Sequence, residues 1–306
     1  MKVVINPKYV FLHDFIYHLP EYFFKEGEII YQGRNILKRY EVQGVQLIVK
    51  RFKHPYIINQ IVYSFFRDSK AKRSFDYSLE VQKRGFGVAD PIAYIEIKRK
   101  GLFAESYYIS LYMESMEELR EYMAVYKVED RELRLAFARF TAQLHEAEIL
   151  HIDYSPGNIL VNNQGNSYAF ALVDVNRMRF KKVSVFDACK NLARLATSRK
   201  VLDEVASEYA SQRGWNSADV ISLMRKYSDR FFRSYTFRLG NKAWQKKTGG
   251  GLIYPSVFYR LYDLLSRCKL LSEATRDVYL HKRIRVYNDY LRPFDFRKVF
   301  PENDQN

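Results

Sequence analysis

The sequence predicts an α+β protein with a β-rich N-terminal lobe, residues 1–114, and a helical C-terminal lobe, residues 115–306. Stretches of alternating apolar residues separated by short turns concentrate before residue 115, and apolar residues at helical spacing dominate after it. The chain has 306 residues, of which 47% are hydrophobic. That length and apolar fraction are enough for one large domain or for two lobes of ordinary size.

The first strands are expected to form two successive hairpins. Residues 29–31 are a short apolar run, and residues 33–35 follow as a turn. Residues 37–42 and 45–52 alternate and are rich in β-branched side chains, with a reversal at residues 43–44. This pattern is typical of antiparallel strands joined by tight turns.

A helix and a further pair of strands complete the N-terminal lobe. The pattern becomes helical between residues 59 and 83, where Phe75 and Leu79 form an apolar pair one turn apart. Residues 92–98 and 107–113 then have the character of two more strands, joined by a basic turn.

Helices dominate the C-terminal lobe. Residues 131–147 place apolar side chains at helical spacing. Residues 151–180 form a compact non-helical section, after which Asp187 is expected to cap a helix that runs toward Arg199. The chain then continues mostly as amphipathic helix to about residue 289.

The most informative residues lie in the non-helical section. His151 and Asp153 are followed by Asn158 in a Ser-Pro-Gly turn, and Asp174 ends the next apolar strand. In the N-terminal lobe, Lys50 lies at the end of an apolar strand. The alternative interpretation of His151, Asp153 and Asn158 is a loop capped by an Asx-turn network. The combination with Asp174 favours a catalytic loop.

These residue types are those that phosphoryl transfer requires, because that reaction depends on positioning and charge neutralisation more than on covalent chemistry. Asp153 can accept the proton of an acceptor hydroxyl group. Asn158 and Asp174 offer oxygen atoms, which Mg²⁺ prefers as ligands. Lys50 can bind nucleotide phosphates, although the basic residues that follow it are rivals for this role.

A carboxylate on the predicted helix is expected to hold that lysine in place. Asp76 and Glu80 lie four residues apart and therefore share one face of the helix. Both are candidates, and Glu80 is preferred.

The order of these residues is similar to that of the bilobal protein-kinase-like fold. In detail the chain resembles the bacterial lipopolysaccharide kinase family, the Kdo/heptose kinases. The resemblance extends over roughly residues 28–195 and rests on five segments: residues 31–35, 69–75, 91–96, 153–160 and 173–180.

The resemblance implies an enzyme that uses ATP and Mg²⁺. Asp153 would be the catalytic base, Asn158 and Asp174 would hold Mg²⁺, and Lys50 would bind the ATP phosphates. The other nucleotide-binding residues would be the phosphate-covering turn, the helix carboxylate and the hinge that grips adenine: Gly33, Arg34, Asn35, Glu80 and Met113.

Departures from the protein-kinase pattern argue against a regulated protein kinase. Ile152 stands where protein kinases carry arginine, so control by a phosphorylated activation loop is not expected. The implied function is phosphorylation of a Kdo or heptose hydroxyl group in the lipopolysaccharide inner core. The alternative is an atypical protein kinase or another small-molecule phosphotransferase of the same fold.

The chain is strongly basic, with 50 Lys and Arg against 35 Asp and Glu and a net charge of +15. Residues 225–306 hold 18 basic and 8 acidic residues, so +10 of that charge lies in the last 82 residues. A solvated helical face is the simpler interpretation. Interleaved aromatic residues favour a surface for a phosphorylated glycolipid of the lipid A-core type or for an anionic inner membrane. Without a zinc-finger or RRM-like motif, no nucleic-acid partner is expected.

The cysteine and hydropathy patterns indicate the compartment. Cys189 and Cys268 are too few for a disulfide framework, which favours a reduced cytosolic protein. Residues 1–20 do not have the pattern of a signal peptide, and no stretch approaches the ~18 apolar residues of a membrane span. We therefore expect a cytoplasmic protein, peripheral at the inner face of the inner membrane of a Gram-negative bacterium.

Overall fold

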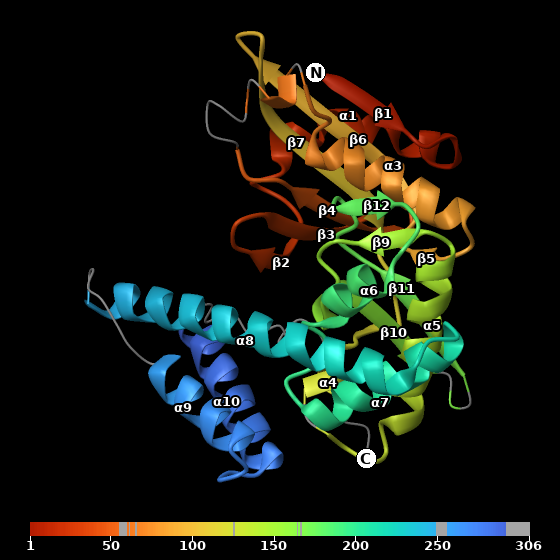
Figure 1. Cartoon of the computed structure of the whole chain (residues 1–306). Coiled ribbons are helices and arrows are strands. Elements are labelled where there is room, and N and C mark those ends of the chain that lie inside the picture. Colours follow the sequence, from red (N-terminus) through yellow and green to blue (C-terminus); the bar gives the residue numbers. More distant parts are fainter. Residues whose placement is uncertain are drawn as a thin grey trace, which may run out of the picture. The chain divides into compact units, whose positions relative to one another are not determined.

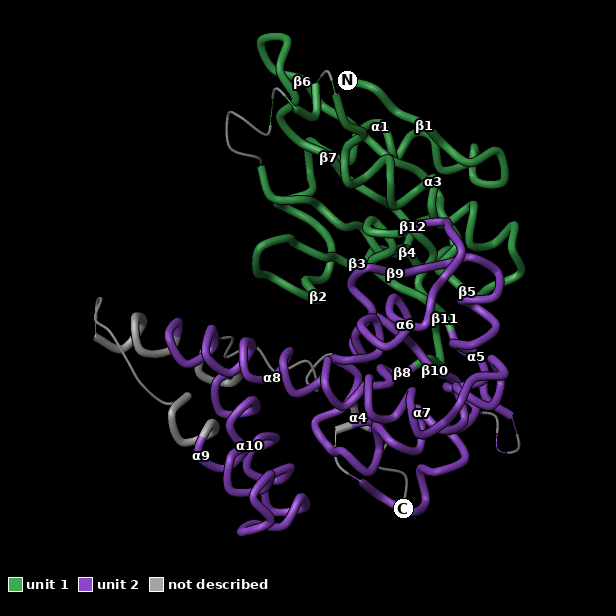
Figure 2. Tube along the Cα trace, viewed as in Figure 1, with its two compact units in different colours: residues 1–116, 171–178, 296–306 green, residues 117–170, 179–295 purple. Residues whose placement is uncertain are grey.

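The computed structural model of the chain describes residues 1–54, 60, 62–64, 66–124, 126–163, 165, 167–248 and 256–291. These residues form two compact units (Figures 1 and 2). Unit 1 contains residues 1–116 and 171–178, and unit 2 contains residues 117–170 and those from 179 onward in the helical part. Unit 1 is rich in strands and unit 2 in helices, which confirms the predicted α+β class.

Unit 1 is built on a six-stranded antiparallel sheet with the strand order β1-β6-β7-β4-β3-β2. The strands are β1 (Lys2–Ile5), β2 (Glu28–Gln32), β3 (Ile36–Val42), β4 (Val45–Arg51), β6 (Pro91–Arg99) and β7 (Leu102–Leu111). The predicted succession of hairpins is confirmed. Gln43 and Gly44 join β3 to β4 with φ angles of 50° and 77°, the left-handed conformation that a two-residue hairpin turn requires.

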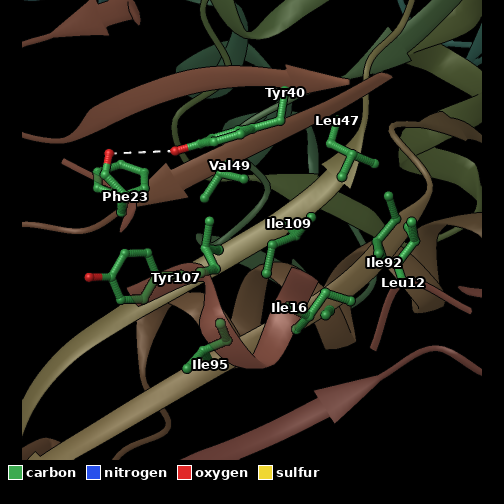
Figure 3. Packing of buried hydrophobic residues seen from close by; sticks show 12 residues of the cluster. Leu12, Ile16, Phe23, Tyr40, Leu47, Val49, Ile92, Ile95, Tyr107 and Ile109 are labelled. Atoms are coloured by element: carbon green, nitrogen blue, oxygen red, sulfur yellow. Dashed lines mark hydrogen bonds between the residues drawn. The ribbon is translucent and has the colours of Figure 1, made fainter. Parts of the chain in front are cut away.

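One face of the sheet packs on α1 (His13–Tyr22), which follows a 3₁₀ turn at Pro7–Leu12. Leu12, Ile16 and Phe23 come from this segment and meet Leu47 and Val49 of β4 in the main core of unit 1 (Figure 3). Because side chains alternate along a strand, β4 sends these two residues to one face and its even-numbered residues to the other.

The opposite face of the sheet packs on α3 (Lys70–Lys83). Phe75 of α3 lies in a second cluster with Phe52, Tyr94 and Tyr108. Lys50 lies two residues before Phe52, so its side chain points to the same face of the sheet, the face that packs on α3. A short strand, β5 (Gly87–Val88), follows α3 and pairs in parallel with the end of β11 (Tyr168–Leu172).

Unit 2 is mainly helical. Its helices are α4 (Arg120–Ala124), α5 (Arg131–Glu146), α6 (Val185–Leu192), α7 (Arg199–Gln212), α8 (Ser217–Thr248), α9 (Ser256–Arg267) and α10 (Glu273–Leu291). Short elements between them are β8 (Glu117–Glu118), β9 (Ile149–His151), the 3₁₀ turn η2 (Pro156–Asn158), β10 (Ile159–Asn163) and β12 (Met178–Phe180). Figure 1 shows α9 and α10 side by side along the distal part of α8.

The predicted cap at Asp187 is wrong. The side chain of Ser184 caps α6 by accepting a hydrogen bond from the backbone N–H of Asp187 at 3.2 Å. Asp187 lies in the first turn, where its charge interacts favourably with the helix dipole. The helix ends at Leu192, and a separate cap at Ser198 starts α7.

Buried ion pairs join the last three helices of unit 2. Arg276 of α10 lies 3.1 Å from a carboxylate oxygen of Asp229 on α8 and 3.6 Å from one of Asp263 on α9. The side chains of Arg276 and Asp263 are only 2% and 4% exposed. Charges this deep are tolerated because they neutralise each other.

Candidate active site

Lys50 and Asp174 come together in unit 1. Lys50 projects from the central strand β4, and Asp174 follows β11. The Lys50 Nζ atom donates a hydrogen bond to Asp174 Oδ1 at 2.5 Å. Their side chains are 13% and 34% exposed, so the pair is partly shielded from water and still accessible. Its charges can reach a ligand.

Asp174 is held in an uncommon backbone conformation. Its φ of 56° lies in the left-handed region, which Asp tolerates better than most residues. The side-chain amide of Asn176 donates to Asp174 Oδ1. Arg73 of α3 in turn donates from Nη1 to the carbonyl oxygen of Asn176 at 3.0 Å. These bonds fix the carboxylate beside Lys50.

The face of α3 that approaches this pair carries cations. Arg73 is buried, and Lys70 places its Nζ atom 6.0 Å from the Phe52 ring centroid, with Lys50 Nζ 5.4 Å from the same centroid. Burial, together with the charges of Arg34, Arg73 and Lys50, lowers the pKa of Lys70, and Asp174 opposes that shift. This cationic group suits a ligand with several negative charges.

The expected carboxylate partner of Lys50 is not found on α3. Glu80 accepts a hydrogen bond from Arg84 Nε at 2.7 Å, and Asp76 accepts one from Lys72 Nζ at 2.8 Å. Both acids lie on the more exposed flank of the helix, because Phe75, Ser78 and the residues in phase with them fill the buried face. The prediction that Glu80 orients Lys50 is therefore wrong. The carboxylate that contacts Lys50 is that of Asp174.

The predicted phosphate-covering turn is a compact connection between β2 and β3. Gly33 donates its N–H to the carbonyl oxygen of Asn35 at 3.0 Å. The Asn35 side chain accepts from the N–H of Lys53 at 3.2 Å, which ties the turn to the end of β4. The Tyr31 ring lies over Gly33, since a Cβ atom there would come within 2.3 Å of the Tyr31 hydroxyl oxygen. Arg34 is exposed.

The predicted hinge residue Met113 is half-buried just after β7. The backbone beside it is anchored, because the N–H groups of Leu111 and Tyr112 donate to the carbonyl oxygens of Asp90 and Gln46, each at 2.9 Å.

Asp153 and Asn158 come together in the predicted catalytic loop of unit 2, residues 151–158. Asn158 donates its side-chain amide to the carbonyl oxygen of Asp153 at 2.8 Å. His151 is fully buried, and its Nδ1 atom accepts from the N–H of Asp153 at 3.1 Å. Asn191 of α6 donates to the carbonyl oxygen of His151 at 2.8 Å. The loop is thus fixed through its main chain, and the Asp153 side chain is half-exposed.

Two residues, Arg194 in unit 2 and Arg73 in unit 1, contact predicted site segments and were not predicted from the sequence. Arg194, just after α6, donates from Nη1 to Asp153 Oδ1 at 2.6 Å. Its guanidinium carbon lies 5.2 Å from the ring centroid of Phe231 on α8. Nothing in the spacing of Arg194 marks it, because its partner lies 41 residues away. In unit 1, Arg73 lies within a segment that carries the family resemblance and was not singled out.

The residues present suit phosphoryl transfer. Unit 1 supplies an ammonium group beside a carboxylate, and unit 2 supplies a half-exposed carboxylate on a fixed loop. Among the described residues, no group of three or more His, Cys, Asp and Glu side chains is placed so that it could hold a metal ion. A divalent ion would therefore need phosphate oxygens or water as further ligands, which is how Mg²⁺ is bound in nucleotide sites.

A family model described as the lipopolysaccharide kinase (Kdo/WaaP) family matches residues 18–227. The chain belongs to this family. Among solved structures, WaaP in complex with acyl carrier protein has a TM-score of 0.53 and 15% sequence identity, and the match covers 75% of this chain and 99% of that chain. The comparison with curated proteins gives no match.

Family membership confirms the predicted enzyme class and the kinase-like fold. The chain is an ATP-dependent phosphotransferase of the lipopolysaccharide kinase kind, with an alcohol group as acceptor. The family match ends at residue 227 inside α8, so the rest of α8, α9 and α10 lie outside it.

Proposed function

We propose that this protein transfers the γ-phosphoryl group of Mg-ATP to a hydroxyl group of a Kdo or heptose residue in the lipopolysaccharide inner core. The observation that carries the proposal is the half-exposed Asp153 carboxylate, held on a loop whose main chain is fixed by His151 and Asn158. In a member of this kinase family, that carboxylate is the group suited to accept the hydroxyl proton.

The Lys50–Asp174 pair belongs to the nucleotide half of the proposal. Lys50 would bind the α- and β-phosphates, and the turn of Gly33, Arg34 and Asn35 would cover them. Met113 would lie at the adenine hinge. Mg²⁺ would be held by oxygen atoms of Asp174 and Asn158 and would neutralise phosphate charge. A carboxylate that already binds the ammonium of Lys50 is a position suited to a cation.

The proposal is tested by radiolabel transfer from γ-labelled ATP to two purified acceptors, Kdo-lipid A and a heptose-bearing inner core. We expect transfer to one of them, and we expect Asp153→Asn to slow it by about 10²–10⁴-fold, the usual contribution of a general base. Asp219→Asn is the matched control, because Asp219 is an exposed acid in the first turn of α8. Absence of transfer to both acceptors would refute the function, and full activity of Asp153→Asn would refute the role of Asp153.

The proposal includes a peripheral position at the anionic inner face of the inner membrane, where a lipid-linked acceptor would be presented. No helix in the described part of the chain is long and apolar enough to cross a membrane. Support comes from α9, which exposes Leu261 and Leu264 and buries Asp263 and Ser266. An outward apolar face beside basic residues is typical of helices that lie on anionic membranes.

A further inference from the structure

Arg194 occupies a position next to the proposed reacting centre. It follows the C-terminus of α6, and its neighbours Ala193 and Leu195 are buried. The N–H of Leu195 donates to the carbonyl oxygen of Leu192 at 3.0 Å, which fixes the backbone on either side. The guanidinium group itself is half-exposed and contacts Asp153. A fixed backbone and an accessible charged group are what ligand recognition requires.

The distance from Arg194 to the acceptor follows from this contact. Nη1 of Arg194 lies 2.6 Å from Asp153 Oδ1. A hydroxyl group that gives its proton to this carboxylate must form a hydrogen bond to it, so the guanidinium lies within about 6 Å of the acceptor oxygen. Substituents on the carbon atoms next to that hydroxyl are therefore within its reach.

An aromatic surface adjoins the guanidinium. Phe231 lies 5.2 Å from the guanidinium carbon of Arg194. Phe231 stacks on Tyr235 one turn further along α8, with a centroid distance of 5.4 Å and an interplanar angle of 14°. Both aromatic residues lie beyond residue 227, outside the family match.

Resting on the function proposed above, we propose that Arg194 is the acceptor-specificity residue and that it binds an acidic group of the acceptor sugar while the sugar ring rests on Phe231. A guanidinium presents paired N–H donors that match a carboxylate or a phosphate. In the absence of acceptor, Asp153 is the anion that it binds. When the acceptor enters, its acidic group takes over Arg194, and the carboxylate of Asp153 is released to bind the hydroxyl group.

The test compares acceptors that differ only in the acidic group. The probes are Kdo-lipid A, its Kdo methyl ester, and its dephosphorylated form. For the wild type we expect the KM of one modified acceptor to rise by about 10–100-fold, the loss expected for a charged hydrogen bond. A rise with the ester identifies the carboxylate as the ligand of Arg194, and a rise with the dephosphorylated acceptor identifies the phosphate.

The variants then locate the effect. Arg194→Gln should raise the KM for intact acceptor by a similar factor and leave the KM for ATP unchanged. For the modified acceptor whose KM is raised in the wild type, Arg194→Gln should cause no further rise in KM, because the contact is already lost. Arg194→Lys should recover part of the loss, and Phe231→Ala should raise the acceptor KM. Arg131→Gln, at an exposed arginine at the start of α5, is the control.

Two results would overturn the proposal. If Arg194→Gln lowers kcat equally with all three acceptors and leaves their KM values unchanged, Arg194 contacts the transferred phosphoryl group instead. Indifference of the wild type to both modifications would show that no acidic group is recognised. Absence of wild-type transfer both to these acceptors and to the heptose-bearing inner core would instead refute the proposed function, so the two failures can be told apart.

Discussion

At the residue scale, the loop of residues 151–158 shows how a few neutral side chains position one acid. His151, Asn158 and Asn191 each bind main-chain atoms of the loop. Because Nδ1 of His151 accepts a hydrogen bond, its proton is assigned to Nε2. The buried histidine is therefore a neutral support of the loop that carries Asp153.

A second buried histidine gives a prediction about pH. His145 on α5 contacts the Tyr209 hydroxyl at 2.9 Å and Asn191 at 3.3 Å. Burial lowers the pKa of His145 from 6.5 to about 4. The unfolded chain therefore binds one more proton than the folded chain between these values. The free energy of unfolding should fall as the pH drops from 6.5 to 4, with a total loss of about 3 kcal/mol from this group.

The measurement is denaturant unfolding of the wild type and His145→Gln between pH 4.5 and 7.5. The variant should be less stable at neutral pH, and its free energy of unfolding should decline less steeply below pH 6.5. His13→Gln is the control, because His13 is exposed. Parallel curves for the wild type and His145→Gln would contradict the assignment.

At the element scale, the strands and the long helices follow from sequence pattern because their signals are local. The alternation in residues 37–42 and 45–52 gave β3 and β4, and the polar turn between them holds the φ angles of a hairpin. β7 begins at Leu102, five residues before the predicted start, because the whole strand pairs with β6. The first residues of β7 form a strand because they pair with β6, and local sequence pattern does not reveal this pairing.

The N-terminal helix was missed although its signal was present. Leu12, Ile16, Leu19 and Phe23 recur at helical spacing, and all four are fully buried. Pro20 and several polar residues between them conceal the pattern. The first strand, β1, is harder to predict because it is short and lies at the edge of the sheet.

The error at Glu80 comes from the phase of α3. The sequence predicted Phe75 and Leu79 as an apolar pair one turn apart, and Asp76 and Glu80 as acids that share a face. In the structure Leu79 is 39% exposed, and the small residues Ser74 and Ser78 are buried instead. Tight packing against the sheet selects small side chains, and that preference depends on the partner surface. Residues 151–158, by contrast, are contiguous in the sequence, so their spacing alone predicted that His151, Asp153 and Asn158 belong to one loop.

The last three helices give a stability prediction. Arg276 joins α10 to Asp229 on α8 and Asp263 on α9. Arg276→Met leaves two acids with one cation fewer, and a buried charge without its partner typically costs about 3–5 kcal/mol. We expect hydrogen exchange in α9 and α10 to accelerate and the chain to unfold at lower denaturant concentration.

The matched control for this substitution is Lys282→Met, on the exposed side of the same helix. The double variant Arg276→Met/Asp263→Leu should recover part of the loss, because it removes a charge together with its partner. Unchanged exchange rates in Arg276→Met would show that these helices are held by apolar contacts alone.

At the scale of the whole molecule, the basic residues behind the net charge of +15 fall into two sets, one neutralised in ion pairs and one exposed. Several arginines of the helical end are neutralised in ion pairs, among them Arg199, Arg225 and Arg276. Other basic residues of α8, α10 and the turn between α9 and α10 are exposed: Lys226, Arg230, Arg238, Lys242, Lys269, Lys282 and Arg285. This second set supplies the charge that an anionic membrane would meet.

Membrane attachment through α9 is tested with vesicles. Leu261 and Leu264 are 45% and 56% exposed on a helix that buries Asp263, so the exposed leucines have surface to transfer into lipid. Full burial of a leucine side chain contributes about 1.5–3 kcal/mol. Leu261→Ser/Leu264→Ser should therefore weaken binding to phosphatidylglycerol-containing vesicles by at least about tenfold. Cosedimentation measures the effect.

Charge and apolar contact make separable contributions to that binding. Exposed lysines and arginines near an anionic surface contribute about 1 kcal/mol each, screened over a Debye length of about 8 Å at physiological salt. Wild-type binding should fall as salt rises and should be weak on neutral phosphatidylcholine vesicles. Leu79→Ser, at an exposed leucine of α3, should bind as the wild type does. Equal binding of the double variant, or salt-independent binding to neutral vesicles, would exclude α9 as the docking surface and would leave the +15 charge to serve another anion.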